Sequence, residues 1–121
     1  MDKFNIKDSH PNISRLEKLF LEEGVLTKFK KNEYLVRQNE KTNQIGFIMS
    51  GMFRLSHIDA DAHEWIVGYS FVNDFVCDYP SFIKQATSTV NIQAPTECEV
   101  YLLSLNHVCR DIPTLIRLLL R

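Results

Sequence analysis

The sequence predicts a mainly β domain with flanking helices. Three observations favour this class: short apolar–polar alternations in the middle of the chain, polar turns between them, and helical stripes near the two ends. Many short strands separated by frequent turns are typical of a β-sandwich or roll rather than of a parallel sheet. The length of 121 residues suits one such domain.

The helical stripes bound the predicted β region. Over residues 11–23 apolar side chains recur with helical spacing, and Gly24 follows as a C-terminal stop. Residues 1–10 are expected to form a polar N-terminal segment, and 11–105 a β-roll with its N-terminal helix. Residues 106–121 are expected to be a C-terminal helical segment, because Asp111 can cap a helix and apolar residues follow.

Strands are predicted where apolar residues alternate. The first of them lies around Tyr34–Arg37, and Asp59–Glu64 is expected to connect two later strands as a hairpin. Val90–Ala94 and Cys98–Leu102 are expected to form a strand pair with Pro95–Glu97 as its turn. The alternating positions of the middle strands are Ile45, Phe47, Met49, Phe53, Leu55, Trp65, Val67, Tyr69 and Phe71.

Composition excludes several classes of function. The chain has 14 Lys+Arg against 15 Asp+Glu, whereas a protein that binds DNA with its own surface normally has a basic excess. The charged N-terminus is unlike a signal peptide and no apolar run has the length of a membrane span, so we expect a cytoplasmic protein. Cys77, Cys98 and Cys109 do not suit a disulfide framework, a zinc site or a four-cysteine iron–sulfur cluster.

Three stretches together resemble one known family. The stretch GFIMSGMFRLSHIDADAHEWIVGYSF resembles a strand, polar hairpin and strand of the cyclic-nucleotide-binding fold, with Gly51 and Arg54 as matches. NDFVCDYPSF resembles the start of its phosphate cassette, and STVNIQAPTECEVYLLS resembles the two strands that follow. The chain is therefore similar to the effector domain of Crp/Fnr-type transcription regulators, a double-stranded β-helix or jelly roll.

The resemblance implies a function. It implies a non-enzymatic domain in which a small-molecule effector enters the roll and controls DNA binding by a helix-turn-helix module, which this sequence lacks. It also implies a homodimer in the full-length protein, with the apolar Leu118–Leu120 in the seam between subunits, and DNA contact only through the missing module. No cofactor or metal is expected, and the effector is unknown.

The departures from the family fall in the cassette. In nucleotide-binding members a Gly, an acidic residue and an Arg followed by Ser or Thr hold the sugar and the phosphate. Here Cys77 replaces the Gly, Asp78 replaces the usual Glu, and Ser88 stands in the place of the Arg beside Thr89. Because a buried phosphate needs a cation and dipoles, we expect poor binding of cyclic AMP. Lys84 is the nearest cation in sequence.

The candidate ligand-binding residues come from the same cassette. Polar caps and turns are the alternative interpretation for the hydroxyl and carboxyl side chains among them, since such residues commonly have those roles. A buried structural thiol is the preferred interpretation of the cysteine. The candidates are Cys77, Asp78, Tyr79, Ser81, Ser88 and Thr89.

Other features suggest weaker alternatives. His57, His63 and Glu64 raise the possibility of a metal-dependent cupin-type enzyme, but their spacing differs from the cupin pattern and we expect them at the surface. A stand-alone β-roll that serves only in protein interaction is a further alternative. The aromatics from Trp65 to Phe71 are expected in the core. Asn32 and Ala62 occupy turns where the family often has Gly, and Ala tolerates positive φ poorly.

Overall fold

Two antiparallel sheets and one helix make up the fold. A computed structural model describes residues 11–41, 43–78, 81, 84 and 86–104, so segments 1–10 and 106–121 and Tyr79 lie outside the described residues. The elements are the helix α1 (Pro11–Glu23) and the strands β1 (Val25–Phe29), β2 (Tyr34–Val36), β3 (Gln44–Ser50), β4 (Phe53–Ile58), β5 (Glu64–Ser70), β6 (Phe75–Val76), β7 (Asn91–Gln93) and β8 (Cys98–Ser104).

The strands form a first sheet in the order β1-β8-β3-β6 and a second sheet in the order β2-β7-β4-β5. All the strand pairs within these sheets are antiparallel. The predicted class, a mainly β roll, is confirmed. β1 was not predicted, because its residues do not alternate cleanly: among them only Phe29 is buried against the core.

The core lies between the sheets. Large apolar side chains from both sheets meet there, and the Phe29 ring packs edge-on against Phe53 with ring centroids 5.3 Å apart. Such burial is the main favourable contribution to folding. The buried members of the cluster are Phe29, Ile48, Phe53, Leu55, Val76, Val90, Ile92, Ala94, Cys98 and Val100.

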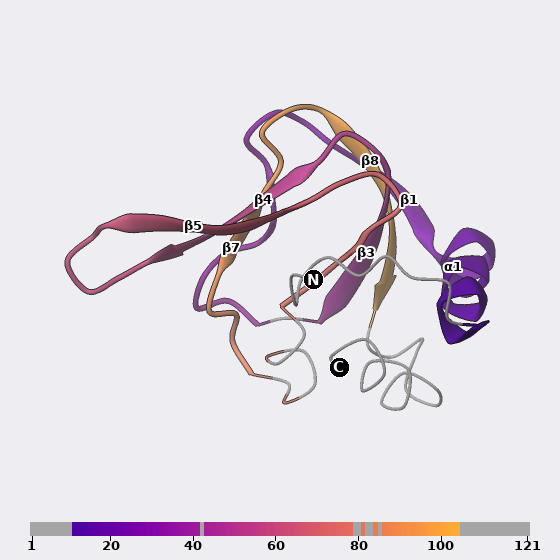
Figure 1. The fold of residues 1–121 in the computed structure, drawn as a ribbon, viewed down its shortest axis with the longest axis horizontal. Helices are drawn as coiled ribbons and strands as arrows, with labels where there is room; N and C mark the ends of the chain where they lie inside the picture. The colour runs from indigo at the N-terminus through magenta and orange to yellow at the C-terminus, as the bar shows by residue number, and fades with distance from the viewer. Residues whose placement is uncertain (1–10, 42, 79–80, 82–83, 85, 105–121) are drawn as a thin grey trace.

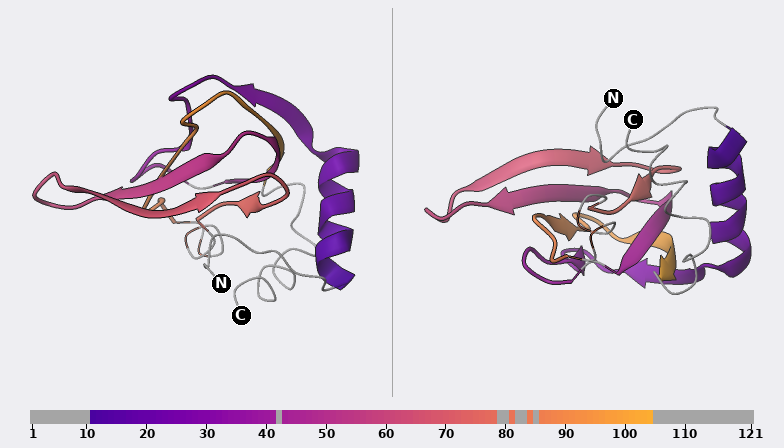
Figure 2. Two further views of the ribbon diagram at one scale, coloured as in Figure 1. Left: turned by 45° about the horizontal axis from the view of Figure 1, so that its top comes forward. Right: turned by 90° about the horizontal axis from the view of Figure 1, so that it is seen from below.

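The N-terminal helix ends where the sequence predicts. The backbone N–H of Gly24 donates to the carbonyl of Phe20 at 2.9 Å, and β1 begins one residue later. The Phe20 ring is fully buried against Phe47 and Phe75, at centroid distances of 6.3 and 5.3 Å. This aromatic group fastens α1 to the first sheet. Figure 2 shows the helix at the end of the molecule opposite the long β4–β5 hairpin.

The β4–β5 hairpin differs from its prediction. It projects from the roll (Figure 1), and Trp65, Tyr69 and Phe71 are 58%, 39% and 48% exposed, so the expectation that these aromatics are core is wrong. Leu55 pairs with Gly68 but Ser56 pairs with Ile66, which leaves Val67 as an extra residue in a bulge. Side chains of paired residues point to the same face of a sheet, and an extra residue in one strand reverses the alternation beyond it. Trp65 and Tyr69 therefore lie on opposite faces, although their spacing alone would place them on the same face.

The last two strands also differ from their prediction. β7 and β8 both form, but they do not pair with each other, because β7 lies in the second sheet and β8 in the first. Residues 94–97 therefore carry the chain from one sheet to the other instead of closing a hairpin. This crossing connects the two layers of the roll beside the core.

Two turns adopt the backbone that glycine usually supplies. Asn32 has φ 73° and Ala62 has φ 66°. The asparagine was expected to tolerate this region. The alanine adopts it as well, because the hydrogen-bonded tip of the hairpin imposes it: the Ala62 N–H donates to the Asp59 carbonyl, and the Asp59 N–H to the His63 carbonyl.

Candidate ligand-binding site

A buried carboxylate occupies the centre of the candidate site. Asp78 follows β6 and is 2% exposed. Its Oδ2 accepts hydrogen bonds from the backbone N–H and from the hydroxyl of Thr89, both at 2.9 Å. Its Oδ1 accepts a longer bond of 3.3 Å from the backbone N–H of Ser81. Among the described residues, the ion pairs Lys18–Glu22 and His63–Asp59 do not include Asp78. The described hydrogen bonds to its carboxylate all come from neutral donors.

These donors decide the ionisation of the carboxyl. Burial acts to raise the pKa of Asp78, but the bonds from the Thr89 N–H and hydroxyl, with those from Ser81, outweigh it and hold the pKa below its ordinary value. Asp78 is therefore ionised at neutral pH. A negative charge is already present inside the cassette before any ligand arrives.

Ser88 is buried beside this carboxylate, with 1% exposure. Its hydroxyl lies 2.8 Å from the carbonyl oxygen of Val90 and 3.3 Å from Asp78 Oδ2. One hydroxyl hydrogen serves one acceptor at a time, so the shorter bond to Val90 takes precedence. The Val90 N–H in turn donates to the Ser88 hydroxyl at 3.1 Å. Ser88 therefore shapes its own backbone, as the turn-residue interpretation expected.

Backbone contacts fix the position of the Ser88 segment. The N–H of Ser88 donates to the carbonyl of Glu40 at 2.7 Å, and the carbonyl of Ser88 accepts from Asn39 at 2.8 Å. An isolated bridge joins Lys41 to Thr87 next to them. The loop between β2 and β3 thus holds the backbone of this segment in place.

A small cavity opens beside the carboxylate. It measures about 20 Å³, which is room for one water molecule. Its lining combines polar side chains with apolar ones from the second sheet. The lining residues are Leu35, Val36, Lys41, Asn43, Gln44, Cys77, Asp78 and Ile92. A cyclic nucleotide does not fit a space of this size without movement of the surrounding loops.

Cys77 belongs to the wall of this cavity. It is 1% exposed, and burial, with the nearby Asp78 charge, raises the pKa of its thiol well above the ordinary value. The expectation of a buried thiol is confirmed. A protonated, enclosed thiol is a poor nucleophile, so the residue acts here through its volume.

The structure brings five of the six candidate residues together: Cys77, Asp78, Ser81, Ser88 and Thr89. Tyr79 lies outside the described residues. Sequence reasoning missed Lys41 in the cavity wall and His57, whose Nδ1 lies 2.7 Å from the Thr89 carbonyl oxygen. Both come from distant parts of the chain, and no local pattern marks them. Lys84, which the sequence suggested as a nearby cation, is exposed.

A larger hollow lies elsewhere on the molecule. It measures about 340 Å³ and is lined by residues of β1, the end of β3 and the start of β8, namely Lys28, Phe29, Lys30, Ser50, Glu97, Cys98 and Glu99. The lining includes two lysines and two glutamates, so it carries no net charge. None of the candidate residues borders it, and we place the candidate site at the smaller cavity.

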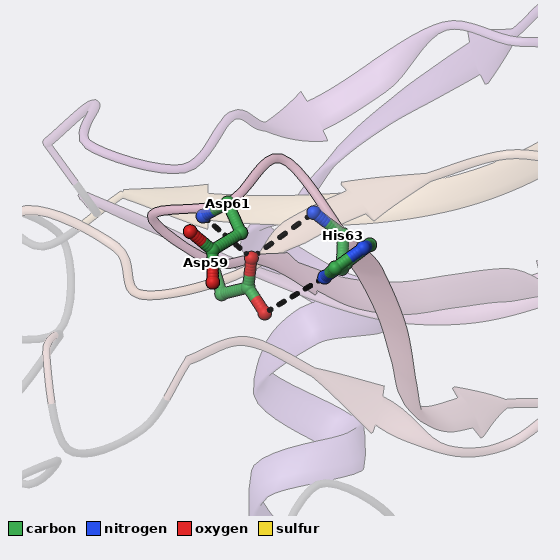
Figure 3. A group of neighbouring side chains, drawn as sticks. All are labelled: Asp59, Asp61 and His63. Atoms are coloured by element: carbon green, nitrogen blue, oxygen red, sulfur yellow. Dashed lines mark hydrogen bonds and ion pairs between the residues drawn. The ribbon is translucent and has the colours of Figure 1, made fainter.

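The polar hairpin tip brings together Asp59, Asp61 and His63 (Figure 3). The Asp59 carboxylate accepts from the N–H groups of Asp61 and His63 at 2.9 and 3.0 Å, and from the indole N–H of Trp65 at 2.9 Å. These bonds, the Trp65 bond first, lower the pKa of Asp59. The carboxylate thus closes the turn. His57 is half-buried and lies outside this group, which gives the cupin alternative no support.

The fold and the cassette define a β-roll ligand-binding domain, in which an acidic residue faces a hydroxyl-bearing segment between two sheets. The chain belongs to the family of cyclic nucleotide-binding domains, which matches residues 26–110. A search of curated proteins found no relative. No described helix is long and apolar enough to cross a membrane.

Solved structures share the fold at low sequence identity. The sensor domain of the transcriptional regulator DNR from Pseudomonas aeruginosa has a TM-score of 0.70 and 18% identity, over 87% of this chain and 71% of that one. The c-di-GMP responsive regulator CLP from Xanthomonas campestris has a TM-score of 0.71 and 19% identity, over 88% of this chain and 55% of that one.

The regulatory subunit of a cAMP-independent protein kinase A from Trypanosoma brucei has a TM-score of 0.76 and 21% identity, over 90% of this chain and 41% of that one. The chain therefore spans about half the length of CLP and less than half of the kinase subunit. At these identities the likeness establishes the fold alone.

Proposed function

We propose that this chain is the effector-sensing domain of a bacterial Crp/Fnr-type transcription regulator. A small molecule enters the roll at the cassette, and a separate helix-turn-helix module, paired in a dimer, contacts DNA. Family membership and the likeness to the DNR sensor domain support this proposal. The observation that carries it is the meeting of Asp78, Ser88 and Thr89 beside a cavity in the roll.

The proposed domain is a poor receptor for cyclic AMP. A cyclic phosphate would meet the Asp78 carboxylate in a setting of low dielectric, without an arginine at Ser88 to offset the repulsion. The loss of a charged hydrogen bond alone weakens binding by about 1.5–3 kcal/mol. Such a domain responds to a different effector. The T. brucei subunit described as cAMP-independent supports the idea that this fold need not respond to cyclic AMP.

Calorimetric titration with cyclic AMP and cyclic GMP tests this proposal. We expect the wild type to bind both more weakly than micromolar. Ser88→Arg supplies the missing cation and should tighten cyclic AMP binding by about tenfold or more. Thr87→Arg is the matched control, since it adds the same charge at an exposed neighbouring position. Micromolar or tighter binding by the wild type would contradict the proposed exclusion of cyclic AMP.

Thermal unfolding with a panel of cyclic nucleotides and uncharged small molecules tests the sensing role. A true effector at a hundred times its dissociation constant stabilises the fold by about 2.7 kcal/mol.

Metal analysis of the purified protein separates the enzyme alternative from the sensor. Stoichiometric iron, zinc or manganese lost on substitution of His57 or His63 would favour the cupin-type enzyme.

A further inference from the structure

Thr89 presents two hydrogen-bond donors in one direction. Its backbone N–H and its hydroxyl both point to a single oxygen, Asp78 Oδ2, at 2.9 Å. Two converging donors of this kind are the usual means by which a backbone segment holds an anionic oxygen. The anion that occupies them here is part of the chain itself.

The geometry of the surrounding segment is independent of this carboxylate. Ser88 is held by Glu40 and Asn39 through its backbone and by Val90 through its hydroxyl. The His57 ring also reaches the Thr89 carbonyl at 2.7 Å. These contacts fix the backbone on both sides of the two donors, so the donors remain in place when the carboxylate leaves. Thr89 is itself exposed, which leaves its donors open to solvent once they are released.

We propose that Asp78 is an internal anion that occupies the anion-binding donors of Thr89, so that it excludes anionic ligands from the cassette. This inference deepens the proposed function, since it names the residue that sets which ligands the site refuses. It assigns Asp78 a role opposite to the one that the family resemblance implies. There the acid holds a ribose hydroxyl and assists nucleotide binding, whereas here it competes with the phosphate.

The two roles predict opposite results for one substitution. If Asp78 competes with the phosphate, Asp78→Ala frees two donors, removes a repelling charge and tightens the binding of cyclic AMP by about tenfold or more. If Asp78 holds the ribose, the same substitution weakens binding or leaves it unchanged. Cyclic AMP is the probe in both cases, measured by calorimetry, with inorganic phosphate as a competitor.

Matched variants assign the gain to the Thr89 donors. Asp61→Ala removes the same charge from an exposed position and should not improve binding. Thr89→Val removes one of the two donors, so the double variant Asp78→Ala, Thr89→Val should lose most of the gain. Inorganic phosphate should displace cyclic AMP from Asp78→Ala at lower concentration than from that double variant.

Asp78→Asn keeps the volume of the side chain and removes its charge, so it tests the proposal if the alanine variant unfolds. Its binding should lie between those of the wild type and of the alanine variant. Weaker or unchanged binding in a folded Asp78 variant overturns the proposal. Tight binding by the wild type would instead overturn the proposed exclusion of cyclic AMP, so the two failures are distinguishable.

Discussion

His57 Nδ1 lies 2.7 Å from the carbonyl oxygen of Thr89, and this contact joins the projecting hairpin to the cassette. A carbonyl oxygen only accepts, so Nδ1 carries the hydrogen when the bond forms. The side chain of Gln38 makes a second connection, since its amide bonds both the N–H and the carbonyl of Ile58 at 2.8 Å. The end of β4 next to the hairpin turn is therefore tied to Thr89 and to the loop of Gln38, whose neighbours Asn39 and Glu40 contact Ser88.

The His57 contact predicts a measurable loss of stability. His57→Ala removes the hydrogen bond of a half-buried residue and should lower the free energy of unfolding by about 1 kcal/mol. His63→Ala is the matched control, because the His63 side chain is 71% exposed and should change stability by less than about 0.5 kcal/mol. Urea denaturation followed by circular dichroism measures both. Equal effects of the two substitutions would show that the His57 contact contributes nothing.

The attachment of α1 depends on Phe20. Phe20→Ala would empty a fully buried ring site against Phe47 and Phe75, and should destabilise the fold by about 3–5 kcal/mol. Leu21→Ala changes the next residue of the same helix, which is 48% exposed, and should cost less than about 1 kcal/mol. Chemical denaturation compares them. A loss below 1 kcal/mol for Phe20→Ala would mean that the helix does not need its aromatic anchor.

Gly51 occupies a position where a side chain would be strained. It has φ 80°, and an added Cβ would lie 2.4 Å from the Cys98 Cβ and 2.7 Å from the Glu97 carbonyl oxygen. Gly51→Ala should therefore cost more than about 2 kcal/mol, since strain from the left-handed backbone adds to the clash. Ala62→Gly is the reverse test at φ 66° and should leave stability unchanged or raise it by up to about 1 kcal/mol. Thermal unfolding of both variants checks the pair, and a well-folded Gly51→Ala would contradict it.

Asp78 makes the stability depend on acid. Its folded-state pKa lies below the ordinary value, so its contribution is complete above the unfolded pKa of about 4 and is lost as pH falls through the folded pKa. The difference in unfolding free energy between the wild type and Asp78→Asn should be constant between about pH 5 and 7 and shrink below about pH 4. Asp61→Asn controls for net charge. A difference that does not change down to pH 3 would contradict the shift.

The two described cysteines should be inert in the folded protein. Burial raises the pKa of Cys98 to about 11, assisted by the charge of Glu33, and burial also raises the pKa of Cys77 well above its ordinary value. At pH 8 a thiol of pKa 11 is ionised in about one molecule per thousand. In a Cys109→Ser background, a disulfide reagent should find no fast thiol before denaturation and two after it. Rapid labelling of the native protein would show that the cassette opens readily.

The sequence predicts the fold better than it predicts the site. Helix α1 and the alternating strands were predictable, because periodicity reports directly which residues face a core. The hairpin was predicted as a strand pair but not as an exposed one, since a bulge at Val67 and projection beyond the roll leave no trace in the local pattern. Family likeness located Asp78 and Thr89, but not their bond to each other.

That bond joins residues 11 positions apart, and the bracing contacts come from farther away. His57 reaches Thr89 across 32 positions, and the Glu40 carbonyl meets Ser88 through a loop that carries no motif. Such contacts depend on how the two sheets close, which no short stretch of sequence records. Matching residues to a family pattern therefore identifies the residues of a site but not the contacts between them.

The bulge at Val67 has a consequence for tracing the ancestry of this domain. Side chains along β5 alternate between the inward and the outward face. Between the bulge and the hairpin tip, this alternation is shifted by one residue relative to the part of the strand nearer the roll. An ungapped alignment with a relative that lacks the bulge, if it is in register over 68–70, would equate inward positions with outward ones over 64–66. A relative that lacks the bulge should instead be aligned with a single-residue deletion at Val67. Conservation scores for the hairpin then compare positions that face the same way.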